Sequence, residues 1–145
     1  MLSDSKKILE NNIKDIVHED TQRHEKTVDL TLNKVMKIKN RGSLDFGGSE
    51  YQPSDTEEIP PKKKTEDDKY GWWRLDEGIY LVEYNEKINR GNVWIQPHSR
   101  LIKTGAYTPG RIIEEEGKIT GLLIVGDNGV DIKENARIAT AYSFE

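Results

Sequence analysis

The clearest periodicity along the chain is an alternation of apolar and polar residues around position 30. Val28, Leu30 and Leu32 alternate with polar residues in this segment. Because successive side chains of a strand point to opposite faces, the alternation predicts a half-buried strand over residues 27–38. Upstream, apolar residues recur at helical spacing, which predicts a surface helix over residues 3–18 capped by Ser3 or Asp4.

From Trp72 onward, short apolar runs are separated by turn residues. Tight turns are expected at 76–78, 89–91, 115–117 and 127–129, because Gly, Asn and Asp adopt the backbone angles that such turns require. Many short strands between regular turn signals are typical of a sandwich, jelly roll or barrel. The strands are predicted at 72–75, 79–84, 93–96, 99–103, 110–113, 119–125 and 136–143.

Residues 40–70 differ in composition from both flanks. They contain Pro53, the pair Pro60 and Pro61, a run of three lysines at 62–64 and an acidic run at 66–68. This composition predicts a long charged loop at about 40–70, with a short strand near 44–46. The chain has 145 residues, which is the length of one domain, so we expect a single domain over 1–145 that includes the loop.

Charge and composition exclude several classes of protein. The formal net charge of −4 argues against a general nucleic-acid binder, which would present a basic face. The chain has no cysteine, which rules out disulfides and thiolate metal sites. No apolar run approaches the ~20 residues that span a bilayer, and the N-terminus lacks the apolar core of a signal peptide. We therefore expect a cytoplasmic protein with neither membrane nor nucleic acid as a partner.

Hydrogen-bonding and cationic side chains gather between residues 96 and 112, within the strand-rich half. A segment that only packed would not need them, whereas one that binds a polyphosphate and a sugar would. Two plainer interpretations remain open: the serine is bonded to local backbone, and the cations are ordinary solvated strand residues. The side chains concerned are His98, Ser99, Arg100, Lys103, Tyr107 and Arg111.

Six short segments carry a family resemblance because of their order along the chain. They lie at 1–4, 27–32, 74–84, 98–105, 108–112 and 137–140. Together they resemble the motifs of deoxycytidine triphosphate (dCTP) deaminases and trimeric dUTPases, over residues 1–38 and 72–145. The resemblance implies a mainly β fold, a distorted jelly-roll β-barrel of the dUTPase-like type with a short N-terminal helix. It also implies a homotrimer whose nucleotide pockets lie between subunits, and Mg²⁺ bound with a deoxynucleoside triphosphate.

The same resemblance implies roles for individual residues. Ser99 falls on a pocket serine, expected to be catalytic and nucleotide-binding, and Arg100 and Lys103 fall on motif positions close to phosphate. Asp29 falls on a strand aspartate that organises the pocket and can hold magnesium through water. No residue set is predicted to ligate a metal by itself. Thr108 and Arg111 complete the predicted nucleotide-binding set.

The chain also departs from the family pattern at catalytic positions. The family's catalytic aspartate is replaced by Ile113, and three glutamates follow at 114–116. Glu114 is the simplest catalytic replacement, although a run of glutamates is also typical of a solvated turn. The deaminase strand glutamate falls on Val125 or Gly126, neither of which can transfer a proton. Two further family residues are also replaced: His98 stands where the motif has an arginine, and Thr140 stands where the last strand has a glutamine.

Three functions are compatible with these matches to the family motifs and departures from them. The opening 1–4 segment favours a dCTP deaminase-like hydrolase that converts dCTP to dUTP. The alternative is a dUTP pyrophosphatase, which needs a carboxylate such as Glu114, magnesium and an ordered water. The third is a catalytically inactive family member that binds nucleotide or serves a structural role, because fold alone does not determine function.

Overall fold

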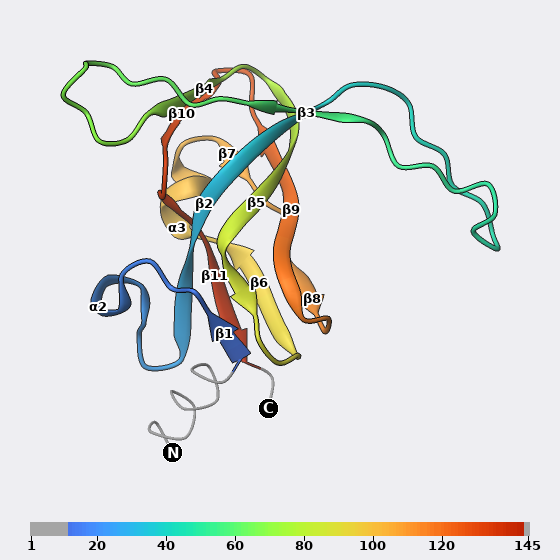
Figure 1. The fold of residues 1–145 in the computed structure, drawn as a ribbon, viewed down its shortest axis with the longest axis horizontal. Coiled ribbons are helices and arrows are strands. Elements are labelled where there is room, and N and C mark those ends of the chain that lie inside the picture. The colour runs from blue at the N-terminus through green and yellow to red at the C-terminus, as the bar shows by residue number, and fades with distance from the viewer. Residues whose placement is uncertain (1–11, 144–145) are drawn as a thin grey trace.

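The computed structural model describes residues 12–143, which form a mainly β structure whose large sheet curls around the core (Figure 1). The helices are α2 (Glu19–Gln22) and α3 (Ser99–Lys103). The strands are β1 (Ile13–Lys14), β2 (Thr27–Ile38), β3 (Thr56–Ile59), β4 (Trp72–Leu75), β5 (Gly78–Ile88), β6 (Val93–Pro97), β7 (Ala106–Tyr107), β8 (Arg111–Ile113), β9 (Gly117–Val125), β10 (Val130–Lys133) and β11 (Arg137–Ser143).

All the strand pairs in the described region are antiparallel. The large sheet has the order β7-β9-β5-β2-β11-β6-β8, with β1 paired to β5 and β3 paired to β2. Strands β10 and β4 form a separate two-stranded sheet. The prediction of a mainly β, curled sheet is confirmed. Within residues 12–143 no helix is both long and apolar enough to cross a membrane.

Strand β2 confirms the prediction made from alternation. Val28, Leu30, Leu32 and Val35 are all fully buried in the core. Asp29 and Thr31, on the opposite face of the strand, are also buried. Both faces of β2 are therefore covered, so the strand's polar residues must find partners inside the molecule.

Three predicted elements are wrong. Residues 3–11 of the predicted helix lie outside the described residues, but Ile13 and Lys14 form a strand paired to β5, because Ile13 is buried in the core. Segment 99–103 is the helix α3 instead of a strand. The predicted strand near 44–46 is absent: these residues lie at the end of a projecting loop.

Three strands besides β1 have no counterpart in the prediction. Strand β3 lies inside the charged 40–70 region, where it pairs with the end of β2 and accepts a hydrogen bond from Trp73 Nε1 to the Ile59 carbonyl at 2.8 Å. Strands β7 and β10 are short. Each is held by pairing with another strand, β9 and β4 respectively, and not by a strong pattern of its own.

Candidate functional site

The basic segment of the sequence is presented by α3, directly after β6. His98 caps the helix: its Nδ1 accepts a hydrogen bond from the Arg100 backbone N–H at 3.1 Å. Leu101 is buried and anchors the helix to the core, while Ser99, Arg100 and Lys103 are exposed. The helix therefore turns a serine and two cations toward solvent on a fixed support.

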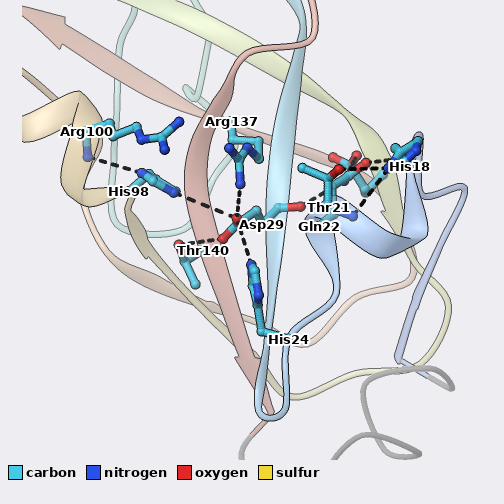
Figure 2. A network of polar contacts seen from close by, with 10 residues as sticks. His18, Thr21, Gln22, His24, Asp29, His98, Arg100, Arg137 and Thr140 are labelled. Atoms are coloured by element: carbon cyan, nitrogen blue, oxygen red, sulfur yellow. Dashed lines mark hydrogen bonds and ion pairs between the residues drawn. The ribbon is translucent and has the colours of Figure 1, made fainter.

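Next to this helix lies a buried carboxylate, Asp29 of β2 (Figure 2). Arg137 Nη1 donates to Asp29 Oδ2 at 3.1 Å, and the Thr140 hydroxyl donates to Oδ1 at 3.3 Å. His24 Nε2 lies 3.1 Å and His98 Nε2 lies 3.7 Å from Oδ2. Asp29 and Thr140 face one another directly in the β2–β11 register. We call these five residues the Asp29 cluster.

The electrostatics of the cluster explain how a buried charge is tolerated. An ionised carboxylate inside a protein is costly unless it is paired and hydrogen-bonded. Here the Arg137 guanidinium supplies the charge, while Thr140 and His24 supply further contacts. Burial of the ring lowers the pKa of His98 below its usual value. The Asp29 carboxylate raises this pKa in part, whereas the charges of Arg137 and Arg100 lower it further. His98 is therefore neutral near pH 7; its Nδ1 accepts from the backbone, so its proton lies on Nε2, toward Asp29.

A second buried carboxylate, Glu86 of β5, lies behind this cluster and is fully buried. The Thr31 backbone N–H donates to its Oε1 at 2.7 Å and the Thr31 hydroxyl to its Oε2 at 2.6 Å. Gln22 Nε2 bridges the two strands, donating to Glu86 Oε2 at 2.7 Å and to the Asp29 carbonyl at 2.9 Å. Burial raises the pKa of Glu86 although these hydrogen bonds act in the opposite direction.

The remaining predicted residues gather around the turn that joins β8 to β9, two strands that do not pair with each other. Glu114, Glu115 and Glu116 are exposed and, with Arg111 and Lys118, line a hollow of about 430 Å³. The Arg111 guanidinium donates to the Thr120 carbonyl, which ties β8 to β9. Thr108 is buried, and its hydroxyl donates to the Leu122 carbonyl at 2.6 Å. In this chain Thr108 therefore fixes the segment that precedes β8.

Within one copy of the chain, α3 and the glutamate run lie at opposite ends of β6, and Arg111 pairs with Ile95 between them. Ile113 pairs with Val93 at the beginning of β6, whereas α3 begins just beyond Pro97 at its end. At about 3.3 Å per residue the separation is roughly 15 Å. Figure 1 shows the same arrangement, with α3 and β8 well apart. Ser99, Arg100, Lys103 and Asp29 thus form one group, and Arg111 and Glu114 form another.

Sequence reasoning missed several members of these clusters. Glu86 carried a usable signal, because Val82, Tyr84, Glu86 and Ile88 occupy the inward positions of one alternating strand. His24 and Gln22 carried none, since they precede β2 in an irregular segment. The 137–140 segment carries a family motif. The contact of Arg137 and Thr140 with Asp29 depends, however, on the β2–β11 register, which the motif does not reveal.

Comparison with known proteins places these observations in context. No protein-family profile matches the chain. The chain is 32% identical over 132 residues to a Methanosarcina mazei protein named "Probable deoxyuridine 5'-triphosphate nucleotidohydrolase", covering 87% of this chain and 74% of that protein. A protein of the same name from Methanosarcina barkeri is 33% identical over 137 residues, covering 90% and 74%.

A solved structure supports the fold. The crystal structure of 2'-deoxycytidine 5'-triphosphate deaminase from Agrobacterium tumefaciens matches with a TM-score of 0.65 at 13% identity. The match covers 92% of this chain but only 44% of that one, and at this identity it shows the fold alone. The predicted dUTPase-like fold is confirmed, and with the identity to the archaeal proteins it shows that this chain belongs to the family of dCTP deaminases and dUTPases.

Proposed function

We propose that the protein hydrolyses dUTP to dUMP and pyrophosphate. In this reaction water attacks the α-phosphorus, the bond from that phosphorus to the bridging oxygen breaks, and pyrophosphate leaves. The similar archaeal proteins carry the name of a dUTP nucleotidohydrolase, which supports this reaction over the deamination that the N-terminal segment favours.

The observation that carries the choice is the composition of β9. Deamination needs a group that transfers protons beside the base, and the resemblance puts it at Val125 or Gly126. Val125 is buried in the core, and no residue from Gly121 to Gly126 has an ionisable side chain. Hydrolysis of a phosphoanhydride needs instead cations for the phosphates and a carboxylate for the water, and both groups are present on the surface.

In this proposal, α3 binds the phosphates. Arg100 and Lys103 are exposed cations, and the Ser99 hydroxyl is exposed beside them. The Asp29 cluster, behind the helix, holds Arg137 in a fixed position; Arg137 and Arg100 both line a cavity of about 350 Å³. The triphosphate would therefore meet a preorganised set of cations, which costs little reorganisation on binding.

The β8–β9 turn supplies the second half of the site. Glu114 is exposed in a hollow that also contains Arg111, so its carboxylate is accessible to a water molecule and to substrate. Thr108, through its bond to the Leu122 carbonyl, is a positioning residue for this turn.

Because the two halves lie apart in one copy, we propose a homotrimer in which α3 of one subunit meets the β8–β9 turn of the next. A cyclic assembly brings two different surfaces of identical chains together in this way. The proposed substrate is an intracellular nucleotide, so the cytoplasm remains the expected location.

Magnesium fits this arrangement as a companion of the nucleotide. Mg²⁺ is commonly held by one or two carboxylates together with substrate phosphates. The exposed glutamates 114–116 can supply such a carboxylate, and among residues 12–143 no group of three or more acidic or histidine side chains forms a ready-made metal site. Asp29 fits metal binding less well, since Arg137 and Thr140 already occupy its oxygens. When bound, the ion would neutralise charge on the phosphates.

The direct test is to incubate the purified protein with dUTP and, separately, with dCTP in the presence of magnesium, and to separate the products by chromatography. We expect dUMP and pyrophosphate from dUTP. Appearance of dUTP from dCTP would establish the deaminase instead, and absence of turnover with both nucleotides would establish a family member without this activity.

Variants assign the roles. Glu114→Gln should lower kcat by about 10²-fold or more if its carboxylate activates water, while Glu116→Gln, in the same exposed run, serves as the matched control. Ser99→Ala and Lys103→Ala should weaken triphosphate binding without changing the melting temperature. Unchanged nucleotide affinity in both would remove α3 from the site.

A further inference from the structure

The loop between β2 and β3 forms an arm that projects from the body of the molecule (Figure 1). The arm, residues 39–55, continues the β2–β3 hairpin. The Lys39 N–H donates to the Asp55 carbonyl at 2.8 Å, and Ser43 and Gln52 exchange two backbone hydrogen bonds of 2.9 and 3.0 Å. These bonds tie the outgoing and returning halves together along the arm.

The end of the arm is held in a defined turn. Asp45 Oδ1 accepts from the Gly48 N–H at 3.0 Å, and its Oδ2 accepts from the Glu50 N–H at 3.0 Å. Gly48 has φ +99°, a backbone angle that favours glycine. On this turn Leu44 is 86% exposed and Phe46 fully exposed. An ordered turn therefore presents two large apolar side chains that the described part of the chain leaves almost entirely exposed.

A second apolar surface lies on the sheet itself. Six apolar residues face outward from neighbouring strands and form two rows across the sheet. One row runs over β7, β9 and β5 as Tyr107, Ile124 and Ile79, and the other runs over β9, β5 and β2 as Leu122, Leu81 and Met36. Tyr107, Ile79 and Leu122 are 46%, 53% and 38% exposed, and the other three are half-buried. We call these six residues the apolar outer face. Contiguous exposed apolar surface of this kind marks an interaction site.

We propose that the end of the arm of one copy docks on the apolar outer face of a second copy of this chain. The arm supplies two large, projecting apolar side chains, and the outer face supplies a broad apolar surface that residues 12–143 leave partly exposed. Charges beside them are complementary, since Glu50 lies on the arm and Arg111 lines the cavity next to Leu81 and Leu122. The two surfaces differ, so the contact is heterologous, and repeated around a symmetry axis it closes a ring.

The proposed docking rests on these two surfaces and not on the reaction. The docking can therefore be wrong while the protein hydrolyses dUTP, and it can be right if the protein does not. It also differs from the contact between α3 and the β8–β9 turn, because neither α3 nor the glutamate run belongs to the arm or to the apolar outer face. Arg111 lies between the glutamate run and the apolar outer face and borders both. A trimer would use both contacts, and each can be tested by itself.

The absence of cysteine makes a direct test available. In a Phe46→Cys variant the single thiol is labelled with a benzophenone maleimide, whose aromatic rings replace the lost phenyl ring. After irradiation we expect linked pairs of chains, and the modified peptides should map to β5, β7 or β9. Differently tagged copies identify linkage between chains. Val17→Cys, at another exposed apolar residue, is the matched control.

A second variant tests the acceptor. Leu122 is an exposed residue of the apolar outer face, and Leu122→Asp places a charge there. We expect cross-linking from position 46 to fall about tenfold while the melting temperature stays unchanged. The proposal is overturned if position 46 links chains no better than position 17, if the linked peptides lie outside the apolar outer face and its strands, or if light scattering finds only monomer.

Discussion

At the scale of single residues, the two buried carboxylates on neighbouring strands are stabilised in opposite ways. Asp29 is paired with a guanidinium, whereas Glu86 accepts hydrogen bonds only from neutral groups on Thr31 and Gln22. A charge without an opposite charge nearby is penalised by burial, which is why the pKa of Glu86 is raised. The two side chains therefore have different consequences for stability.

The raised pKa of Glu86 gives a prediction about pH. A carboxyl whose pKa is higher in the folded than in the unfolded state binds more protons when folded, so its contribution to stability falls as pH rises above the unfolded value of about 4.3. The loss is complete once pH exceeds the folded pKa. Glu86→Gln cannot ionise, so the melting temperature of the wild type should fall relative to this variant between about pH 4.3 and neutrality.

The measurement is the melting temperature of both proteins from pH 4 to pH 8. The other ionisable groups are the same in the two proteins, so the difference between their melting temperatures reports the contribution of Glu86. An exposed control, Glu77→Gln, measures the effect of removing a surface carboxylate from the same strand-turn region. If the Glu86→Gln curve runs parallel to the wild-type curve, Glu86 has the same pKa in both states and the inference from its burial is wrong.

At the scale of elements, sequence patterns succeeded where one face of a strand is buried. Strand β2 was predicted with both ends correct, and β4 likewise, because alternation or an apolar run marks each of them. Segment 99–103 was misread as a strand because it follows β6 closely and is too short to show a helical period. The signals that define α3 are its ends: a capping His98 and Gly105 with φ +81°.

The site was predicted only in part for a related reason. The concentration of cations at 98–111 is visible in the sequence, but its division between α3 and β8 is set by strand pairing. The partners of Asp29 come from three separate segments, brought together by the register of β2 with β11 and of β11 with β6. Long-range register is not encoded in any local pattern, so these partners could not be found from the chain alone.

Helix α3 depends on one buried side chain, which gives a prediction at this scale. Leu101 is the buried residue of the helix, while its neighbour Ile102 is 54% exposed. Leu101→Ala should lower the free energy of unfolding by about 2–5 kcal/mol, because it leaves a cavity under the helix. Ile102→Ala, the same loss of side chain one residue away, should cost about 0.5 kcal/mol or less. Denaturant titration of both variants measures the difference, and equal effects would contradict the anchoring role.

At the scale of the whole molecule, the proposed dUTP site needs a second copy of the chain, because its two halves lie apart in one copy. Nucleotide bound only at α3 of a lone chain would have phosphate contacts without a nearby glutamate. In the proposed assembly, α3 of one subunit meets the β8–β9 turn of the next and completes the site, and the proposed arm contact would attach the same chains a second time. Function and assembly would then be coupled, since dissociation would separate Glu114 from the phosphates.

Mixing two inactive variants tests this coupling. One variant, Lys103→Ala with Ser99→Ala, lacks the phosphate half, and the other, Glu114→Gln, lacks the glutamate half. When subunits are exchanged in equal amounts, half of the sites receive an intact α3 and half receive an intact β8–β9 turn. About a quarter of the sites therefore regain both parts. We therefore expect dUTP hydrolysis to recover to about a quarter of the wild-type rate. If each site lies within one chain, the mixture stays as inactive as its components, because no exchange can join the two intact halves.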